Sequence, residues 1–368
     1  MPPIRILVVD DSALHRKMLC AALSGDATIE IAGVAADGRI ALSKMQQLHP
    51  DLITLDIEMP GWNGLETLVE IRKLNPKLPV IMFSSFTEHG AAATLEALAR
   101  GASDYAAKPA NAANFDEAKE RVRADLIPKI KALCAQAIPA ATAKPIPRGF
   151  TIKLAARSGP RASVEVLAIG ASTGGPNALA ALLPNFPADF PVPIVIVQHM
   201  PPIFTRLLAE RLSKTSKIQV REGETGKTLA PGTAWIAPGG DHMIVERQGV
   251  DVRLEINREA PENSCRPSVD VLFRSIAQVY GAHALSVVMT GMGSDGVRGA
   301  QQLCEAGGEV IVQDEASSVV WGMPGLVAAA GHASGVYSLE SLGPEIIRRV
   351  MSRRSALEEQ TPVVRVRT

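Results

Sequence analysis

Short apolar runs alternate with helical patterns along the first third of the chain, and this alternation constrains the fold more than any other feature. The runs that read as strands are Ile4–Val9, Glu30–Ala35, Leu52–Asp56, Val80–Ser84 and Asp104–Ala107. Amphipathic helical patterns separate them, and one more follows the last run and ends near Ile127. Strands that alternate with helices pair in parallel. The sequence therefore predicts an α/β domain with a doubly wound, parallel sheet.

Polar residues stand where these strands end. Asp10 and Asp11 follow the first strand, Asp56 ends the third, Ser84 ends the fourth and Lys108 follows the fifth. Because open parallel sheets bind ligands at the carboxyl ends of their strands, we expect these side chains to converge. Clustered carboxylates repel one another unless a cation lies among them, and Mg²⁺ prefers oxygen ligands. The alternative, in which the aspartates only cap helices and the lysine is a surface charge, suits one such residue better than the whole set.

The same residues carry a family resemblance. It rests on four segments: Val8-Val-Asp-Asp-Ser12, Leu55-Asp-Ile-Glu-Met-Pro60, Phe83-Ser-Ser85 and Asp104-Tyr-Ala-Ala-Lys-Pro109. Residues 1–125 resemble a response-regulator receiver domain. The resemblance implies a flavodoxin-like strand order 2-1-3-4-5. It also implies phosphorylation of Asp56 with Mg²⁺ as cofactor.

Further roles in this first domain follow only from the resemblance. The implied Mg²⁺ ligands are Asp10, Asp11 and Asp56. The implied phosphate-sensing residues are Ser84, Lys108 and Tyr105. A histidine kinase is the implied phosphodonor.

Residues 126–162 are expected to link two domains and to begin as a helical extension of the first one, since Lys129–Ala137 contains no helix breaker. Prolines interrupt the segment at positions 128, 139, 145, 147 and 160, with alanine, threonine and glycine between them. Such segments favour extended linkers. Residues 163–350 then form a second domain, and residues 351–368 are expected to be a flexible tail.

The second domain begins with Ala168-Ile-Gly-Ala-Ser-Thr-Gly-Gly-Pro176, which continues the apolar run Val164–Ile169. A helical pattern starts at Asn177, so Ser172 lies on a sharp turn between a strand and a helix. The spacing Gly-x-Ser-x-Gly matches a nucleophile elbow, which exposes a serine hydroxyl. The same turn could instead cradle a phosphate or cap the helix without any chemistry.

Two more strands end in a reactive residue. His199 follows the run Pro193–Gln198, and Asp295 follows Leu285–Thr290 inside the glycine-rich segment Gly291–Gly296. Serine, histidine and aspartate at one sheet edge satisfy the logic of a catalytic triad. The order Ser–His–Asp differs from the Ser–Asp–His order of α/β-hydrolases. A buried histidine in the core and a nucleotide-binding turn at residues 291–296 remain open as alternatives.

The second domain resembles the catalytic domain of chemotaxis protein-glutamate methylesterases, the CheB family. The motifs that carry this resemblance are Ala168-Ile-Gly-Ala-Ser-Thr-Gly-Gly175, Val197-Gln-His-Met-Pro201, Ala237-Pro-Gly-Gly-Asp-His242, Arg266-Pro-Ser-Val-Asp270, Thr290-Gly-Met-Gly-Ser-Asp-Gly296 and Gln313-Asp-Glu-Ala-Ser317. The resemblance implies a doubly wound, mainly parallel α/β hydrolytic domain. It implies the triad Ser172, His199 and Asp295, with the backbone N–H groups of Thr173 and Met292 as oxyanion donors.

This family is activated by phosphorylation. The resemblance therefore implies an esterase that hydrolyses glutamate methyl esters, and deamidates glutamines, on the cytoplasmic domains of methyl-accepting chemoreceptors. No cofactor is expected for that reaction. Some family members have histidine where this chain has Cys265, so the role of that position stays open. The rival from another class is a receiver-gated adaptor or nucleotide-binding module without hydrolase activity.

Composition excludes several classes. Basic and acidic residues number 38 each, so a nucleic-acid-binding footprint is not expected. The four cysteines are far apart in sequence, which favours reduced thiols in the cytoplasm over disulfides. No apolar run is long enough to cross a bilayer, so membrane insertion is not expected.

Overall fold

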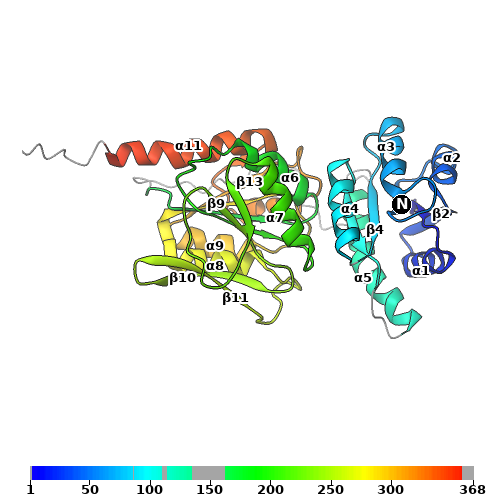
Figure 1. Ribbon diagram of the computed structural model, residues 1–368, viewed down its shortest axis with the longest axis horizontal. Helices are drawn as coiled ribbons and strands as arrows, with labels where there is room; N and C mark the ends of the chain where they lie inside the picture. The colour runs from blue at the N-terminus through cyan, green and yellow to red at the C-terminus, as the bar shows by residue number, and fades with distance from the viewer. Residues whose placement is uncertain (1, 86, 110–113, 135–161, 359–368) are drawn as a thin grey trace, which may run out of the picture. The chain divides into compact units, whose positions relative to one another are not determined.

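The computed structural model describes residues 2–85, 87–109, 114–134 and 162–358, which belong to two compact units (Figure 1). Most of the expected linker, residues 135–161, lies outside the described residues, as do residues 359–368 of the expected tail. Each unit is built around its own parallel sheet and is described by itself.

The first unit contains a five-stranded parallel sheet in the order β2-β1-β3-β4-β5, which confirms the flavodoxin-like order. Its strands are β1 Ile4–Val9, β2 Ile29–Ala35, β3 Leu52–Asp56, β4 Val80–Ser84 and β5 Asp104–Ala107. Its helices are α1 Ala13–Leu23, α2 Gly38–Leu48, α3 Gly64–Leu74, α4 Glu88–Ala99 and α5 Phe115–Cys134. Helix α5 continues through Pro128 beyond its expected end at Ile127, because Ile130 and Leu133 are also buried.

Side-chain N-caps stabilise the first turns of helices in the first unit, a few residues after the preceding strands end. The Ser12 side chain accepts a hydrogen bond from the backbone N–H of His15 at the start of α1. Asn63 and Glu66 form a capping box at the start of α3, in which each side chain bonds the other residue's backbone N–H. Because α1 begins two residues after Asp11, Asp10 and Asp11 stay at the edge of the sheet.

The second unit contains a seven-stranded parallel sheet in the order β14-β13-β12-β6-β7-β9-β8, with a separate antiparallel hairpin. The strands of the sheet are β6 Val166–Ala171, β7 Ile194–Gln198, β8 Gln219–Glu222, β9 Thr233–Ile236, β12 Ala284–Val288, β13 Glu309–Gln313 and β14 Val336–Tyr337. The hairpin strands are β10 His242–Gln248 and β11 Asp251–Asn257. This topology confirms the expected doubly wound, mainly parallel domain.

Helices cover both faces of this second sheet. They are α6 Gly175–Leu182, α7 Phe204–Thr215, α8 Val269–Tyr280, α9 Val297–Glu305, α10 Met323–Ala329 and α11 Leu339–Glu358, with short 3₁₀ turns at Leu183–Asn185 and Gly281–His283. Figure 1 shows α8 and α9 with the hairpin on one side of the sheet, and α6, α7 and α11 on the other. The α8 side holds a continuous apolar core that includes Val166, Val195, Phe273 and Leu303.

Strand β6 lies at the point where the strand order reverses. The chain runs from β6 to β7 in one direction, and it later returns to place β12 on the other side of β6. At such a switch point the loops after neighbouring strands diverge to opposite faces and leave a crevice at the carboxyl edge. The residues after β6, β7 and β12 therefore meet at one place.

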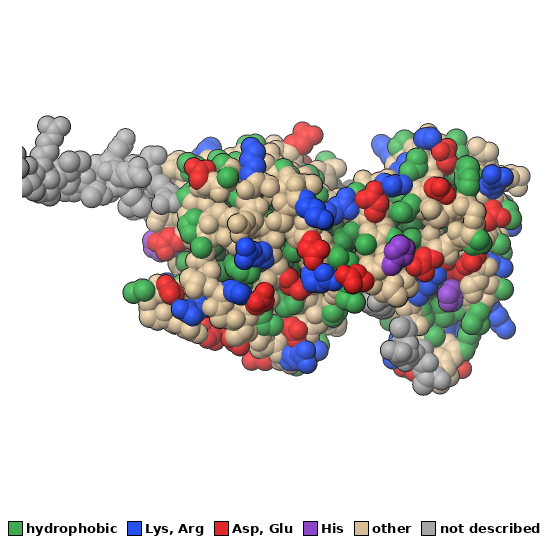
Figure 2. Space-filling view, in the orientation of Figure 1, with side chains coloured by type: hydrophobic (Ala, Val, Ile, Leu, Met, Phe, Trp, Pro, Cys, Tyr) green, Lys and Arg blue, Asp and Glu red, His purple; other side chains and the backbone are tan. Residues whose placement is uncertain are grey.

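The surface carries charges of both signs. Figure 2 shows acidic and basic side chains interspersed over the face in view, in agreement with the equal totals of 38 each. Within the described parts of the chain, no helix combines the length and the apolar character that a membrane crossing requires.

Candidate active site and receiver site

Ser172 and His199 lie side by side because their strands end in register. Ala171, the last residue of β6, pairs with Gln198, the last residue of β7. The backbone N–H of His199 donates to the carbonyl of Ala171 over 3.1 Å. Each strand is thus followed at once by one of the two residues expected to react.

The turn after Ser172 needs glycine for two separate reasons. Gly174 has a φ of +78°, in the left-handed region that side chains disfavour. A Cβ on Gly175 would lie 1.9 Å from the side-chain oxygen of Gln198. The Gln198 side-chain N–H group donates to the Ser172 carbonyl over 2.9 Å, so Gly175 lets this glutamine clamp the turn.

Asp295 lies against His199, with 2.8 Å between Asp295 Oδ2 and His199 Nε2. The carboxylate is only 2% exposed and accepts further hydrogen bonds. Their donors are Asn263 Nδ2, Ser268 Oγ and the backbone N–H groups of Val269, Asp270 and Gly296. Burial alone would raise the pKa of Asp295, but the bonds from His199, Val269 and Ser268 lower it to about 2. The group is therefore a fixed, ionised acceptor for the imidazole.

The His199 ring is polarised by its two neighbours. Burial pulls the pKa of His199 down, but the hydrogen bonds to Asp295 and Cys265 outweigh it and raise the pKa to about 9. The second ring nitrogen, Nδ1, lies 3.7 Å from Cys265 Sγ. Since Asp295 accepts from Nε2, Nδ1 is the nitrogen left to take a proton.

The loop after β12 packs against the serine turn. A Cβ on Gly291 would lie 2.8 Å from the Cβ of Ser172, so only glycine allows this approach. Thr290 Oγ1 donates to the carbonyl of Thr173 over 2.9 Å, which ties the two turns together. Thr173 and Met292, the expected oxyanion donors, thus belong to two segments that the structure brings together.

The glycine-rich segment 291–296 holds Asp295 in place. It leads directly into α9, and Gly293 and Gly296 have φ values of +90° and +95°. A Cβ on Gly291 would also lie 2.4 Å from the sulfur of Met323, so side chains fill the space beside this turn. The segment positions a carboxylate, which makes it a poor cradle for an anionic phosphate.

The first unit gathers carboxylates at its own sheet edge. Ligand oxygens of Asp10, Asp11 and Asp56 all lie within 4.8 Å of one another. Lys108 Nζ lies 2.7 Å from Asp56 Oδ1 and 4.0 Å from Asp10 Oδ2. Burial raises the pKa of Asp56 to about 6 although Lys108 opposes it, and burial also raises the pKa of Asp10.

This acidic cluster fits a divalent cation. Among the described residues, the Oδ2 atoms of Asp10 and Asp56 are buried and have no hydrogen-bond partner. Oxygen atoms of this kind are the ligands that Mg²⁺ takes, usually together with several waters. The exposed Asp11 completes the set from the solvent side.

Ser84 and Lys108 meet at this edge, whereas Tyr105 lies deeper. The backbone N–H of Lys108 donates to the carbonyl of Ser84 over 2.7 Å, and Ser84 Oγ donates to the carbonyl of Gly90 over 3.0 Å. Tyr105 pairs with Met82, two positions before the end of β4. The tyrosine side chain is 7% exposed, and burial raises its pKa.

Comparisons with known proteins match both parts of the chain. The family model of CheB methylesterases matches residues 167–346, and that of response regulator receiver domains matches residues 6–120. A protein-glutamate methylesterase/protein-glutamine glutaminase of Trichodesmium erythraeum is 51% identical over 95% of this chain and 100% of its own length. One of a Nocardioides species is 49% identical over 97% of this chain and 98% of its own length.

The chain belongs to the CheB methylesterase family.

A solved structure agrees with this membership. The catalytic domain of the Thermotoga maritima CheB methylesterase is 40% identical to the matched part, with a TM-score of 0.50. The match covers 50% of this chain and 98% of that domain. Both parts of the CheB architecture expected from sequence, a receiver and a methylesterase domain, are therefore present.

The structure adds residues to the site that sequence reasoning missed. Asn263 and Ser268 both donate to Asp295, over 2.9 and 2.8 Å. In the receiver unit, His15 Nδ1 lies 3.4 Å from Asp10 Oδ1. The Arg266-Pro-Ser-Val-Asp270 motif was a signal for Ser268, but no local pattern indicates Asn263 or His15.

Two polar residues of the family motifs, His242 and Asp270, hold the surrounding structure in place. His242 is fully buried, and its Nδ1 accepts a hydrogen bond from the backbone N–H of Ser268 over 3.2 Å. Asp270 accepts from the backbone N–H of Gly299 over 2.6 Å and from Asn263 over 2.8 Å. They brace the loop and the helix that surround Asp295.

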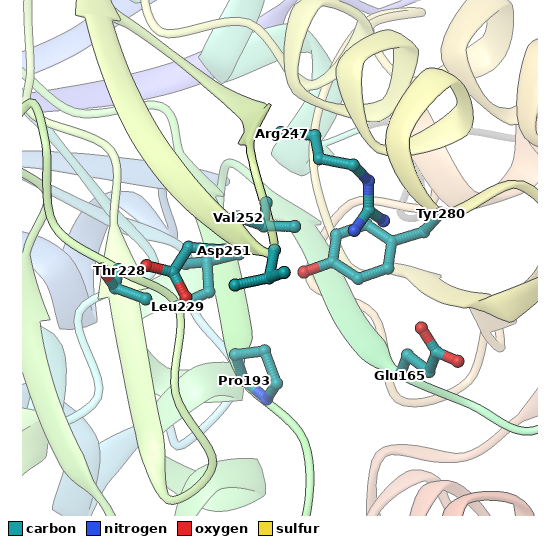
Figure 3. Close-up of a pocket in the computed structure, with 9 residues that line it drawn as sticks. Glu165, Pro193, Thr228, Leu229, Arg247, Asp251, Val252 and Tyr280 are labelled. Atoms are coloured by element: carbon teal, nitrogen blue, oxygen red, sulfur yellow. The ribbon is translucent and has the colours of Figure 1, made fainter.

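A pocket on the catalytic unit lies away from this site (Figure 3). Its lining includes Glu165 and Pro193, which precede β6 and β7, and Arg247 and Tyr280. Glu165 and Pro193 mark the amino ends of β6 and β7, the opposite edge of the sheet from Ser172. The pocket therefore takes no part in the chemistry of the serine.

Proposed function

We propose that this protein is a phosphorylation-activated serine esterase that hydrolyses glutamate methyl esters and deamidates glutamine side chains on chemoreceptor cytoplasmic domains. The observation that carries the proposal is the His199–Asp295 pair, held beside Ser172 at the switch point of a parallel sheet. The activity named for the 51% identical relative supports this choice of substrate.

Ser172 is the nucleophile in this mechanism. His199 donates its Nε2–H to Asp295 and accepts the serine proton at Nδ1. The serine oxygen attacks the side-chain carbonyl of the substrate, and the backbone N–H groups of Thr173 and Met292 stabilise the resulting oxyanion.

The intermediate then collapses to an acyl-enzyme. His199 returns the proton to the leaving group, which departs as methanol from an ester or as ammonia from an amide. A water molecule, deprotonated by His199, attacks the acyl-enzyme and releases a glutamate side chain. Both substrates therefore give the same product through one intermediate.

The receiver unit controls this reaction in our proposal. Asp10, Asp11 and Asp56 would hold Mg²⁺, which when bound neutralises the charge of the carboxylates and of an incoming phosphoryl group. Asp56 accepts the phosphoryl group, while Lys108 and Ser84 hold its oxygens. Tyr105 changes its position when Asp56 is phosphorylated and Ser84 binds the phosphoryl oxygens.

The partners follow from the family and from the receiver. A histidine kinase supplies the phosphoryl group, and methyl-accepting chemoreceptors are the substrates. Since their methylated segments are cytoplasmic, we place the reaction in the cytoplasm. The esterase reaction uses no cofactor, because the proton transfers run through His199.

A fluorophosphonate probe tests the proposal. The full chain is treated with the probe, and the labelled peptide is identified by mass spectrometry. We expect one adduct, on Ser172, and loss of methanol release from a methylated receptor fragment. The Ser172→Ala variant is the control and takes up no probe. Labelling elsewhere, or full esterase activity after complete labelling of Ser172, would contradict the proposed nucleophile.

A further inference from the structure

Cys265 is held beside His199 by a tight loop. The backbones of Cys265 and Glu262 exchange two hydrogen bonds, over 2.9 and 3.1 Å. The two residues between them, Asn263 and Ser264, have φ values of +52° and +62°. Asn263 is anchored in turn by its bonds to Asp270 and Asp295. The position of the thiol is therefore fixed by the backbone hydrogen bonds of the loop and by the hydrogen bonds from Asn263 to Asp270 and Asp295.

His199 has the arrangement of a metal-binding histidine. Its Nε2 bonds the buried Asp295, whose carboxylate fixes the orientation of the ring. Metal-ligating histidines commonly donate one ring N–H to a carboxylate and bind the metal through the other nitrogen. The nitrogen left for a metal is Nδ1, and this is the one that faces Cys265 Sγ.

The separation of the two candidate ligand atoms suits zinc. Zn–S and Zn–N bonds of about 2.3 and 2.05 Å, at a tetrahedral angle, place sulfur and nitrogen about 3.6 Å apart. Cys265 Sγ and His199 Nδ1 are 3.7 Å apart, so an ion could bind both with little movement. The His199 side chain is 14% exposed and Cys265 is half-buried, so an ion can enter from solvent.

We propose that Cys265 Sγ and His199 Nδ1 form a binding site for Zn²⁺ that switches the esterase off. Binding displaces the thiol proton to solvent, and water completes the coordination of the ion. The bound ion occupies the nitrogen that must accept the proton of Ser172. The loss of activity rests on the proposed function of Ser172 and His199, whereas binding of the ion does not.

Metal binding is tested first, with Co²⁺ as a coloured substitute for Zn²⁺. The full chain, reduced with a phosphine, is titrated with Co²⁺, and the thiolate-to-cobalt absorption band is recorded. We expect a band that is absent in Cys265→Ser and Cys265→Ala and that Zn²⁺ abolishes by displacement. Cys304→Ser is the matched control, because Cys304 is also half-buried but donates to the carbonyl of His332. It should keep the band.

The second measurement separates metal binding from catalysis. Ser172→Ala should bind Co²⁺ as the wild type does, and Asp295→Asn should bind it roughly 10–100-fold more weakly, since it lacks the carboxylate that orients the ring. No band in the reduced wild type, or a band that survives both Cys265 substitutions, would overturn the proposed site. Neither outcome would affect the assignment of Ser172.

Inhibition is tested by the ratio of esterase rates with and without Zn²⁺ for each protein. The wild type and Cys304→Ser should lose about 90% or more of their rate at a Zn²⁺ concentration tenfold above the dissociation constant. Cys265→Ser should lose far less at that concentration. Equal inhibition of Cys265→Ser and the wild type would overturn the switch. An active Ser172→Ala variant would instead overturn the proposed function and leave the metal site standing.

Discussion

Both sheets carry their functional residues at the carboxyl edge, but the electrostatic environments of the buried carboxylates at the two edges are opposite. In the receiver unit, Asp10 and Asp56 are buried close together, and each leaves a carboxylate oxygen without a hydrogen-bond partner. In the catalytic unit, the buried carboxylate of Asp295 accepts bonds from the imidazole of His199 and from several neutral donors, and the neighbouring buried Asp270 accepts from Gly299 and Asn263. Both edges are built from residues at the carboxyl ends of parallel strands or in the loops that follow them.

The pKa values express this difference. Burial raises the pKa of Asp56 to about 6, because one lysine does not compensate for lost solvation and a second carboxylate. The hydrogen bonds around Asp295 overcome the same burial and lower its pKa to about 2. An edge with unsatisfied charge calls for a cation, whereas an edge with a satisfied charge can orient a histidine.

The largest effect should come from the catalytic edge alone. We expect Ser172→Ala to fold normally and to lower the rate of methyl ester hydrolysis roughly 10⁴–10⁶-fold, since triad members act as a unit. Methanol release from a methylated receptor fragment measures it, and circular dichroism checks the fold. A folded variant with near-normal activity would contradict the proposed role of the serine.

The receiver edge should be needed for activation only. Asp56→Asn should abolish phosphorylation by small-molecule phosphodonors and keep the unstimulated esterase rate, because no proposed catalytic residue belongs to that unit. Phosphorylation of the wild type should also stop when Mg²⁺ is chelated. The acyl-phosphate is followed with a radioactive donor. A stable acyl-phosphate on the receiver of the Asn variant would show that another residue is the acceptor.

The two edges should be separable by truncation. We predict that a chain beginning at Ser163 is more active than the unphosphorylated full chain and does not respond to phosphodonor. Allosteric coupling of about 1–3 kcal/mol corresponds to roughly 5–150-fold activation. The solved catalytic domain of the Thermotoga relative supports folding of this part by itself. A truncated chain no faster than the full chain would rule out inhibition by the receiver.

A smaller effect on catalysis should follow from the loss of one hydrogen bond to Asp295. Ser268→Ala removes one hydrogen bond to a buried, charged carboxylate, which is worth about 1.5 kcal/mol or more. We therefore expect kcat/KM to fall about tenfold. The rising limb of its pH profile, set by the His199 pKa of about 9, should also move to higher pH, because a carboxylate without the Ser268 donor stabilises the imidazolium more strongly. Ser275→Ala is the matched control, since that buried serine bonds Leu272 and Val245 instead. Equal effects of the two variants would argue for a general loss of stability.

The smallest effects should be on stability, with opposite signs at the two edges. Asp56 holds its proton more tightly when folded (pKa about 6) than at its ordinary value of 3.8. Its unit therefore loses stability as the pH rises from 3.8 to 6 and stays weaker above. Asp56→Asn should stabilise the receiver at pH 7, without Mg²⁺, by up to about 3 kcal/mol.

The pKa shift of Asp295, and therefore its effect on stability, has the opposite sign to that of Asp56. Its pKa is about 2 when folded and 3.8 ordinarily, so its contribution is complete above pH 3.8 and is lost as the pH falls through 2. Asp295→Asn should therefore destabilise the catalytic unit at pH 7 by about 2 kcal/mol. Denaturant unfolding of both variants in a chelator measures the pair. Shifts of the same sign would refute the electrostatic contrast between the edges.

Much of the fold could be predicted because it depends on local patterns. The apolar runs that end at Val9, Asp56 and Ser84 became strands with those same ends. Strand β8 and the strands β13 and β14 were not predicted. Strand β8 is partly exposed and therefore lacks a continuous apolar run, and β14 has only two residues. Strand β13 is a short apolar run next to two glycines. Helix α5 was expected to end near Ile127 and to be followed by a helical extension from Lys129; in the structure it is one helix through Pro128, because Ile130 is buried.

The sequence by itself determined which reactive residues stand at the strand ends or in the turns after them, because strand ends and glycine turns are encoded within a few neighbouring positions. Ser172, His199 and Asp295 could be named on that basis, as could Asp10, Asp56 and Lys108.

Only the tertiary structure decided how these groups are connected. The loop that carries Asn263, Cys265 and Ser268 reaches Asp295 and His199 from about 30 and 66 residues away in sequence. Because the loop lies against both residues, His199 bonds Asp295 through Nε2, and its Nδ1 faces the Cys265 thiol. Contacts over such separations depend on how the whole sheet closes around the loop, and no local pattern of residues encodes them.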